Sequence, residues 1–383
     1  MADHDPLKFA SGLSAKLASS ERHVCIFLGA GASCACGLPD VAALQKSVLG
    51  ELTDSQRIHF EGQLRGRNLE KALSRLRQME GLLSDGQSLD GLTKKEAGNL
   101  DVSVCKAIVR QLSASNANLA PMFHLAAWIA RARYRLPIEI FTVNYDLLAE
   151  RALEELHVPF FDGFMGTLRA RFHTELVEAE PGVGPDSVPS FFVRFWKLHG
   201  SVNWLWHEGE IRRIGSSAPT DLPAAIYPTE TKYEESRRVP FVVLQDRFRR
   251  ALNKPETLAV ITGYSFSDQH LNELIFDAAR RRERSEFVAF CYSDIPDILA
   301  EHAAITPNLQ AISGTEAVIA GSRAFWKPPE DPKPIFWINN QLALRDFRHL
   351  AEYLARSSAR DAVDDQLALA LSQLKVSAKE QHA

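Results

Sequence analysis

The fold class of this 383-residue chain is indicated first by the stretch Val24-Cys25-Ile26-Phe27-Leu28-Gly29-Ala30-Gly31-Ala32-Ser33. Its first half is a short apolar run with β-branched and aromatic residues, which is typical of a buried strand. Two glycines follow, so the backbone can turn sharply and approach a pyrophosphate, with a helix N-terminus supplying free N–H groups. Cys34 replaces the third glycine of the dinucleotide fingerprint, and no clear ribose-binding acid follows about 20 residues later. Alone, the stretch indicates a nucleotide site only weakly.

Further strand candidates alternate with helical segments along the chain. The expected strands are Ile138–Val143, Val193–Leu198, Thr257–Thr262 and Phe287–Tyr292. Strands separated by helices indicate a parallel, doubly wound sheet. The sequence therefore predicts an α/β fold with a Rossmann-like sheet, a helical insertion and a C-terminal helical tail.

The predicted insertion lies between the first two strands, where helical periodicity dominates. Leu69, Leu73 and Leu76 share one face of a helix that Asn68 can cap. Because a βαβ crossover needs far fewer residues than this interval holds, we interpret 54–115 as an insertion. The nucleotide-binding domain is then discontinuous and consists of residues 1–53 and 116–325.

Residues 326–383 are predicted to form a proline-rich linker and a helical tail. Phe347, Leu350 and Leu354 fall on one helical face, and a second apolar stripe follows at Leu367, Leu371 and Leu374. Such stripes pack on their own domain or contact another subunit or partner. Both interpretations stay open at this stage.

Bulk composition is that of an ordinary soluble globular protein, with 45% hydrophobic and 24% charged residues. The net charge of −4 argues against a protein that coats nucleic acid. Two arginine clusters are interpreted as solvated helix faces, and contact with an acidic partner or nucleic acid stays open for them: Arg247, Arg249 and Arg250, and Arg280, Arg281, Arg282 and Arg284. No apolar run approaches the roughly 20 residues that cross a bilayer. The start of the chain lacks an apolar secretory signal, so we expect a cytoplasmic protein without membrane association.

The five cysteines include no C-x-x-C pair, so neither a zinc ribbon nor a redox motif is supported. We expect no metal. Cys34 and Cys36 lie beside the glycine stretch, but no cation lies nearby in the sequence, so packed thiols are favoured over nucleophiles.

Three further segments follow expected strands: Thr142-Val143-Asn144-Tyr145-Asp146, Lys197-Leu198-His199-Gly200-Ser201 and Gly263-Tyr264-Ser265-Phe266-Ser267-Asp268. Ligands of parallel α/β sheets bind beyond the carboxyl ends of the strands, so all these segments point to one edge. Together with the glycine stretch, their order resembles the sirtuin-like NAD-binding family. The last segment resembles the variant found in bacterial sirtuin-like proteins of antiphage defence.

This resemblance implies that NAD is the substrate and that Asn144 and His199 are catalytic. The amide of Asn144 would orient ribose or water, and the imidazole of His199 would act as a general base. The cofactor-binding residues implied or expected from the motifs are Gly29, Ala30, Gly31, Ser33, Asp40, Thr142, Asp146, Gly200, Gly263, Tyr264 and Ser265.

Several of these residues also have purely structural interpretations. Asn144 and Asp146 can each cap the helix that follows, and Asp146 is taken as mainly structural. A histidine at a strand end often only donates to a backbone carbonyl. Asp40 is followed by Val41-Ala42 where sirtuins have Phe-Arg, which puts contacts on that side of the nicotinamide pocket in doubt.

Three functional hypotheses follow from the resemblance. The first is an NAD hydrolase that acts in antiphage defence by depleting NAD, as a homo-oligomer and with a HerA-family translocase as partner. The second is an NAD-dependent protein deacylase, which is weakened because the four-cysteine zinc module of deacylating sirtuins is missing. The third is a module that senses NAD or ADP-ribose without turnover.

Overall fold

The computed structural model describes residues 3–113, 117–180, 192–207, 210–215, 224–226, 239–330 and 332–356. The second apolar stripe predicted for the tail, at Leu367, Leu371 and Leu374, lies outside these residues. Within them, no helix has the length and apolar character needed to span a membrane.

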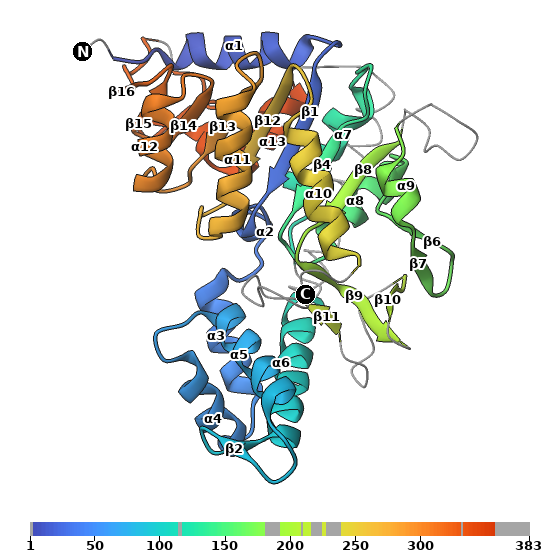
Figure 1. Ribbon diagram of the computed structural model, residues 1–383. Coiled ribbons are helices and arrows are strands. Elements are labelled where there is room, and N and C mark those ends of the chain that lie inside the picture. The colour runs from blue at the N-terminus through green and yellow to red at the C-terminus, as the bar shows by residue number, and fades with distance from the viewer. Residues whose placement is uncertain are drawn as a thin grey trace, which may run out of the picture.

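A nine-stranded sheet forms the centre of the described part of the chain, in the order β16-β15-β14-β13-β12-β1-β4-β8-β5 (Figure 1). The strands from β5 to β14 run parallel, and β15 and β16 are antiparallel additions at one edge. The bounds are β1 His23–Leu28, β4 Glu139–Thr142, β5 Phe160–Phe161, β8 Val193–Lys197, β12 Thr257–Thr262, β13 Glu286–Phe290, β14 Leu309–Ile312, β15 Glu316–Ile319 and β16 Ser322–Phe325. The predicted α/β class with a mostly parallel, Rossmann-like sheet is confirmed.

The strand order reverses direction between β1 and β12. From β1 the chain first forms one side of the sheet with β4, β5 and β8, and it then returns to the other side of β1 for β12, β13 and β14. This switch point is where doubly wound sheets leave a crevice at the carboxyl ends of the strands. The fold therefore places a binding site beside Leu28 and Thr262, the last residues of β1 and β12.

Helices cover both faces of the sheet, and the alternation of β1 shows why the sheet is buried on both sides. Val24 and Ile26 belong to one apolar core, whereas Cys25 and Phe27 belong to the core on the opposite face. The first core includes α1 (Pro6–Ala18), α7 (Ala120–Arg131), α8 (Leu148–Glu155) and α13 (Phe347–Arg356); the second includes α10 (Phe241–Leu252), α11 (Gln269–Arg281) and α12 (Asp297–Ile305).

The predicted tail helix α13 packs on its own domain. Phe347, Leu350 and Leu354 are each at most 3% exposed and join the first core together with Trp128 of α7. For this apolar stripe, the structure therefore decides between the two interpretations in favour of an intramolecular role.

A helical lobe extends from the carboxyl edge of the sheet (Figure 1). It contains α3 (Val41–Glu51), α4 (Asp54–Leu64), α5 (Leu69–Leu82), α6 (Lys94–Ser113) and the hairpin β2 (Ser88–Leu89) and β3 (Leu92–Thr93). Leu73 and Leu76 are buried together, as predicted for one face of a helix, in an apolar core that also contains Phe60 of the lobe and Val202 and Leu205 from outside it. Leu44 and Val48 of α3 join the same core, although α3 precedes the boundary predicted at residue 54. The division of the chain into domains stays a prediction, and the packing groups α3 with the lobe.

A second, antiparallel sheet is absent from the sequence-based prediction. Its order is β11-β9-β10-β7-β6, with bounds β6 Phe164–Met165, β7 Ala170–Phe172, β9 Gly200–His207, β10 Glu210–Arg213 and β11 Ala224–Ile226. The remaining short elements are α2 (Ala30–Cys34), α9 (Thr174–Glu178), β17 (Trp337–Ile338), β18 (Gln341–Leu342) and the 3-10 turn Ala343–Arg345. Because β9 begins at Gly200, the second sheet grows directly from the segment that carries His199.

The glycines after β1 are required by close packing between two loops. A Cβ added at Gly29 would lie 2.4 Å from the carbonyl oxygen of Gly263, and one at Gly31 would lie 2.7 Å from the Gly263 Cα. Gly263 itself has a φ of +67°, which favours glycine. The loops after β1 and β12 can therefore approach each other this closely only because glycine occupies positions 29, 31 and 263.

We expect Gly29→Ala to lower the free energy of unfolding by about 1–3 kcal/mol, because backbone must move to admit the methyl group. The matched control is Gly12→Ala in α1, where nothing lies within 4 Å of the added Cβ. That change should be neutral or stabilising by up to about 1 kcal/mol. Urea unfolding measures both. Equal stability of the two variants would contradict the packing role.

Candidate active site

A pocket of about 1110 Å³ lies at the carboxyl edge of the sheet, large enough for a dinucleotide. Its walls come from the loops after β1, β4, β8, β12 and β13 and from the lobe. The predicted residues that line it are Ala30, Gly31, Ser33, Asp40, Asn144, Asp146, His199, Gly263, Tyr264 and Ser265. Motifs that are far apart in the sequence thus meet in one cavity.

Three predicted site residues do not line the pocket but lie behind residues that do. The Gly29 carbonyl accepts a hydrogen bond from Asn144. The Thr142 hydroxyl accepts from the Asn144 backbone N–H at 3.0 Å and donates to the Leu28 carbonyl. Gly200 has a φ of +95°, which favours glycine at the turn after His199. Their observed contacts are structural.

The Asn144 side chain is held by both hydrogens of its amide. Nδ2 donates to the Gly29 carbonyl at 2.9 Å and to the Ser33 hydroxyl at 2.8 Å. The Ser33 hydroxyl donates its only hydrogen to Asp146 Oδ2 at 2.6 Å. Toward Asn144 it can therefore act only as an acceptor. The amide orientation is therefore fixed. Among the described residues, no donor contacts Asn144 Oδ1, which leaves that oxygen as an acceptor at the pocket wall.

The Asp146 carboxylate fixes the Ser33 hydroxyl that contacts Asn144. Its Oδ1 accepts from the Leu148 backbone N–H at the start of α8, and its Oδ2 accepts from Ser33. Both carboxylate oxygens are thus engaged by the protein, as the structural interpretation of Asp146 predicts. Through Ser33, the same carboxylate fixes the glycine loop and Asn144 relative to each other.

His199 lies between β8 and β9, with its side chain only 7% exposed. Its Nε2 is 3.3 Å from Oδ2 of Asp268, the residue that precedes α11. The ring is not aligned for a hydrogen bond at this distance; such contacts commonly align when substrate binds. In the described part of the chain, Nδ1 has no partner although it is buried.

The glycine loop offers fewer free N–H groups than the sequence indicated. The Gly31 backbone N–H donates to the Gly263 carbonyl at 2.8 Å, and the Ala32 backbone N–H donates to the Gly29 carbonyl at 3.0 Å. The glycines therefore mainly allow the loops after β1 and β12 to pack closely against each other. Any phosphate contact must use the other backbone and hydroxyl groups along this wall.

The remaining predicted contacts have mixed roles. Asp40 lines the pocket and caps α3 by accepting from the Ala43 backbone N–H at 2.7 Å. The Tyr264 ring packs on Phe27, and its hydroxyl donates to Asn272, so the aromatic ring belongs to the core. Ser265 is exposed at the rim, where its hydroxyl pairs with Ser267.

Parts of the pocket wall were not predicted from the sequence. The missed residues with polar side chains include Asn68, Glu70, Lys71, Tyr145, Gln245, Asp268, His270, Glu273, Tyr292, Ser293 and Asp294. Tyr292, Ser293 and Asp294 lie one to three residues beyond Cys291, which follows β13. The rule that ligands bind beyond the carboxyl ends of parallel strands could therefore have predicted them. Nothing in the sequence signals that the lobe supplies Glu70, whose carboxylate accepts from the Tyr145 hydroxyl at 2.9 Å.

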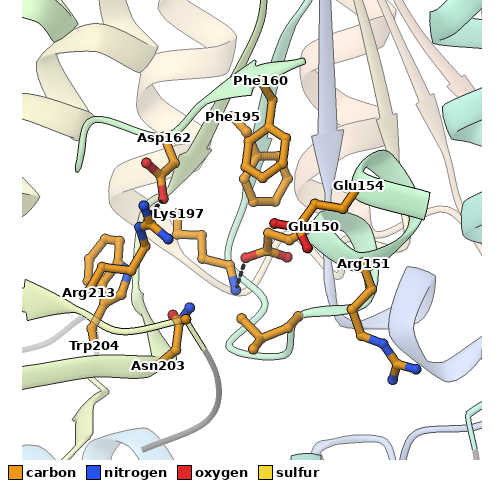
Figure 2. Close-up of a pocket in the computed structure, with 12 residues that line it drawn as sticks. Glu150, Arg151, Glu154, Phe160, Asp162, Phe195, Lys197, Asn203, Trp204 and Arg213 are labelled. Atoms are coloured by element: carbon orange, nitrogen blue, oxygen red, sulfur yellow. Dashed lines mark ion pairs between the residues drawn. The ribbon is translucent and has the colours of Figure 1, made fainter. Parts of the chain in front are cut away.

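A second, smaller cavity is lined by residues of α8, β8, β9 and β10 (Figure 2). Its volume of about 60 Å³ suits a water or two, not a nucleotide. Lys197 lies at its edge, 2.8 Å from Glu150 Oε1, and Arg213 lies 2.8 Å from Asp162. The Lys197 ammonium also donates to the Ser201 hydroxyl and the Asp146 carbonyl. This buried lysine thus ties the Asn144 segment to the His199 segment.

Within the described residues, no group of three or more His, Cys, Asp or Glu side chains could hold a metal ion. Burial raises the pKa of Cys36 to about 12, and it also raises the pKa of Cys34 at the pocket wall. Both thiols therefore stay protonated near neutral pH, which fits packed thiols.

Comparison with known families agrees with the geometry. Residues 138–312 match the SIR2-like domain family. The match runs from the start of β4 to the end of β14 and includes Asn144, His199 and the Gly263–Asp268 segment. A SIR2-like domain implies an NAD-binding or NAD-processing function. The glycine stretch precedes the matched residues, and the fold brings it to the same pocket. Comparison with curated proteins finds no match.

Proposed function

We propose that this protein hydrolyses NAD to nicotinamide and ADP-ribose. The observation that carries the proposal is the placement of Asn144 and His199 on one pocket wall, each with an unsatisfied acceptor atom. They come from the ends of neighbouring strands, inside the SIR2-like match and beside the switch point of the sheet. The imidazole nitrogens of His199 are buried without a hydrogen-bond partner among the described residues. Such groups cost free energy, so a ligand hydroxyl or a water is expected beside the ring.

The chemistry requires little from the protein beyond placement. Cleavage leaves an oxocarbenium-like ribose, as in glycoside hydrolysis. The oxygen of water forms a bond to the ribose anomeric carbon while the bond to nicotinamide breaks. The electron pair stays on the pyridine nitrogen and neutralises its positive charge, so no strong general acid is needed. Asn144 Oδ1 can orient the water, and His199 can accept its proton.

The remaining walls suit the rest of a dinucleotide. We propose that Ala30, Gly31, Ser33, Gly263 and Ser265 border the pyrophosphate, where hydroxyl and backbone groups meet. Asp40 and Asp294 supply carboxylates that can accept hydrogen bonds from ribose hydroxyls. Gly29, Thr142, Gly200, Tyr264 and Asp146 then act by shaping the loops, with no need for direct contact.

The biological setting is proposed from the resemblance to antiphage-defence proteins. NAD depletion would arrest an infected cell, so basal activity should be low until a trigger arrives. A homo-oligomer working with a HerA-family translocase in the cytoplasm is the proposed assembly.

The decisive assay incubates the protein with NAD, alone and with a candidate translocase and DNA, and quantifies nicotinamide by chromatography. We expect equimolar nicotinamide and ADP-ribose. Release that requires an acylated peptide and yields O-acyl-ADP-ribose would replace this proposal with deacylation. Tight NAD binding without nicotinamide release, even in the assembled complex, would replace it with sensing.

A further inference from the structure

Asp268 stands apart from the other pocket acids because it contacts the proposed base. It comes from the loop after β12, whereas His199 follows β8, and β1 and β4 lie between those strands in the sheet. The two side chains are 10% and 7% exposed, and Asp268 Oδ2 lies 3.3 Å from His199 Nε2. Two loops from distant strands thus place a carboxylate against an imidazole in a largely buried setting.

The Asp268 carboxylate divides its two oxygens between two tasks. Oδ1 accepts from the backbone N–H groups of His270 at 2.9 Å and Leu271 at 3.2 Å, which caps α11. Oδ2 has no partner in the described part of the chain except the neighbouring imidazole. The cap fixes the carboxylate, and so it fixes the oxygen that faces His199.

The charge state of Asp268 supports this assignment. Burial acts to raise its pKa, but the contact with His199 and the two capping N–H groups outweigh burial and lower the pKa below its usual value. The carboxylate is therefore ionised near neutral pH and can only accept hydrogen bonds.

We infer that Asp268 is a positioning residue that keeps the proton of neutral His199 on Nε2 and leaves Nδ1 as the basic atom. A carboxylate requires a donor opposite it, and a neutral imidazole carries only one N–H. The lone pair is then on Nδ1. Both ring nitrogens are buried without a hydrogen bond among the described residues, and Nε2 is the one that lies 3.3 Å from the Asp268 carboxylate. This inference rests on the proposed NAD hydrolysis and names the nitrogen that takes the proton.

The alternative is that Asp268 only caps α11. Asparagine caps helices about as well as aspartate, so Asp268→Asn keeps the cap and removes the charge. The chain offers a matched control in Asp5, which caps α1 in the same way: its Oδ1 accepts from Leu7 at 2.8 Å and Lys8 at 3.1 Å. Asp5→Asn tests what the exchange costs where no histidine faces the cap.

The experiment compares steady-state NAD cleavage and ¹⁵N spectra of His199 in the wild type and both variants, with His199→Gln assigning the signal. For Asp268→Asn we expect kcat to fall at least about tenfold and up to about 10⁴-fold, as carboxylate-to-amide changes beside a catalytic histidine do. KM should change little. The Nε2–H tautomer of the wild type should give way to Nδ1–H. Asp5→Asn should match the wild type in both readouts.

Two results would overturn the inference. One is an Asp268→Asn variant with wild-type kcat. The other is a wild-type spectrum in which His199 carries its proton on Nδ1. If the wild type releases no nicotinamide in any assembly, the proposed function fails, while the tautomer measurement still decides the placement of the proton.

Discussion

Asn144→Ala and His199→Ala should each lower nicotinamide release by about 10²–10⁴-fold, the range expected when a positioned catalytic group is removed. Loss of Asn144 removes the acceptor oxygen and also frees the Ser33 hydroxyl that its amide contacts. Loss of His199 removes the base and leaves Asp268 without its neighbour. Because the two groups serve one transition state, the double variant should lose less than the product of the single effects.

Matched controls separate chemistry from folding. Asn253→Ala and His349→Ala alter the same residue types outside the pocket and should retain activity. Circular dichroism and thermal unfolding should show that the Asn144 and His199 variants stay folded. Normal turnover in both folded variants would contradict the proposed catalytic pair.

The largest stability effect is expected at the opposite edge of the sheet, where β4 begins at Glu139. This carboxylate is 1% exposed and accepts from Arg247 Nε at 2.7 Å and Trp196 Nε1 at 2.9 Å, with His23 Nε2 at 3.0 Å. Glu139→Gln leaves the buried Arg247 guanidinium without its countercharge. We expect the free energy of unfolding to fall by about 3–5 kcal/mol, as for other broken buried pairs.

The same group sets an acid limit on stability. Burial acts to raise the pKa of Glu139, but Arg247 and His23 outweigh it, and the pKa lies well below the usual 4.5. A carboxylate with a depressed pKa stabilises the fold fully above its unfolded-state pKa and loses this contribution as pH falls toward the folded-state pKa. Wild-type stability should therefore drop below about pH 4.5 more steeply than that of Glu139→Gln.

Denaturant unfolding across pH checks both expectations, with the exposed Glu283→Gln as control. That control should stay within about 0.5 kcal/mol of the wild type. A Glu139→Gln variant that is equally stable at pH 7 would contradict the role assigned to the buried pair.

Sequence patterns predicted the fold where local signals are strong. Long apolar strands such as β1 and β12 are recognisable because both faces are buried, which gives continuous hydrophobic runs. The short strands β6 and β7 carry too few residues for any periodicity, so the second sheet was missed. The prediction of a solvated helix face is wrong for Arg247. Its side chain is 3% exposed and pairs with Glu139, which is 108 residues away in the chain.

The site was predicted in part because the strands that carry its motifs have strong local sequence signals. Motifs that directly follow strands, including Asn144 and His199, come together at one edge because parallel strands end there. The contact between His199 and Asp268 could not be predicted, since the sequence around Asp268 indicates only the start of a helix. The requirement for Gly29 also has a different cause from the one expected, because it is set by the approach of Gly263 from a distant loop.

A crystal structure of the Asn144→Ala variant with bound NAD would show where the scissile bond lies. We expect the dinucleotide to lie across the ends of β1 and β12, with its nicotinamide–ribose bond between residue 144 and the His199 imidazole. NAD bound outside this pocket, or inside it with that bond turned away from both residues, would rule out NAD hydrolysis by Asn144 and His199.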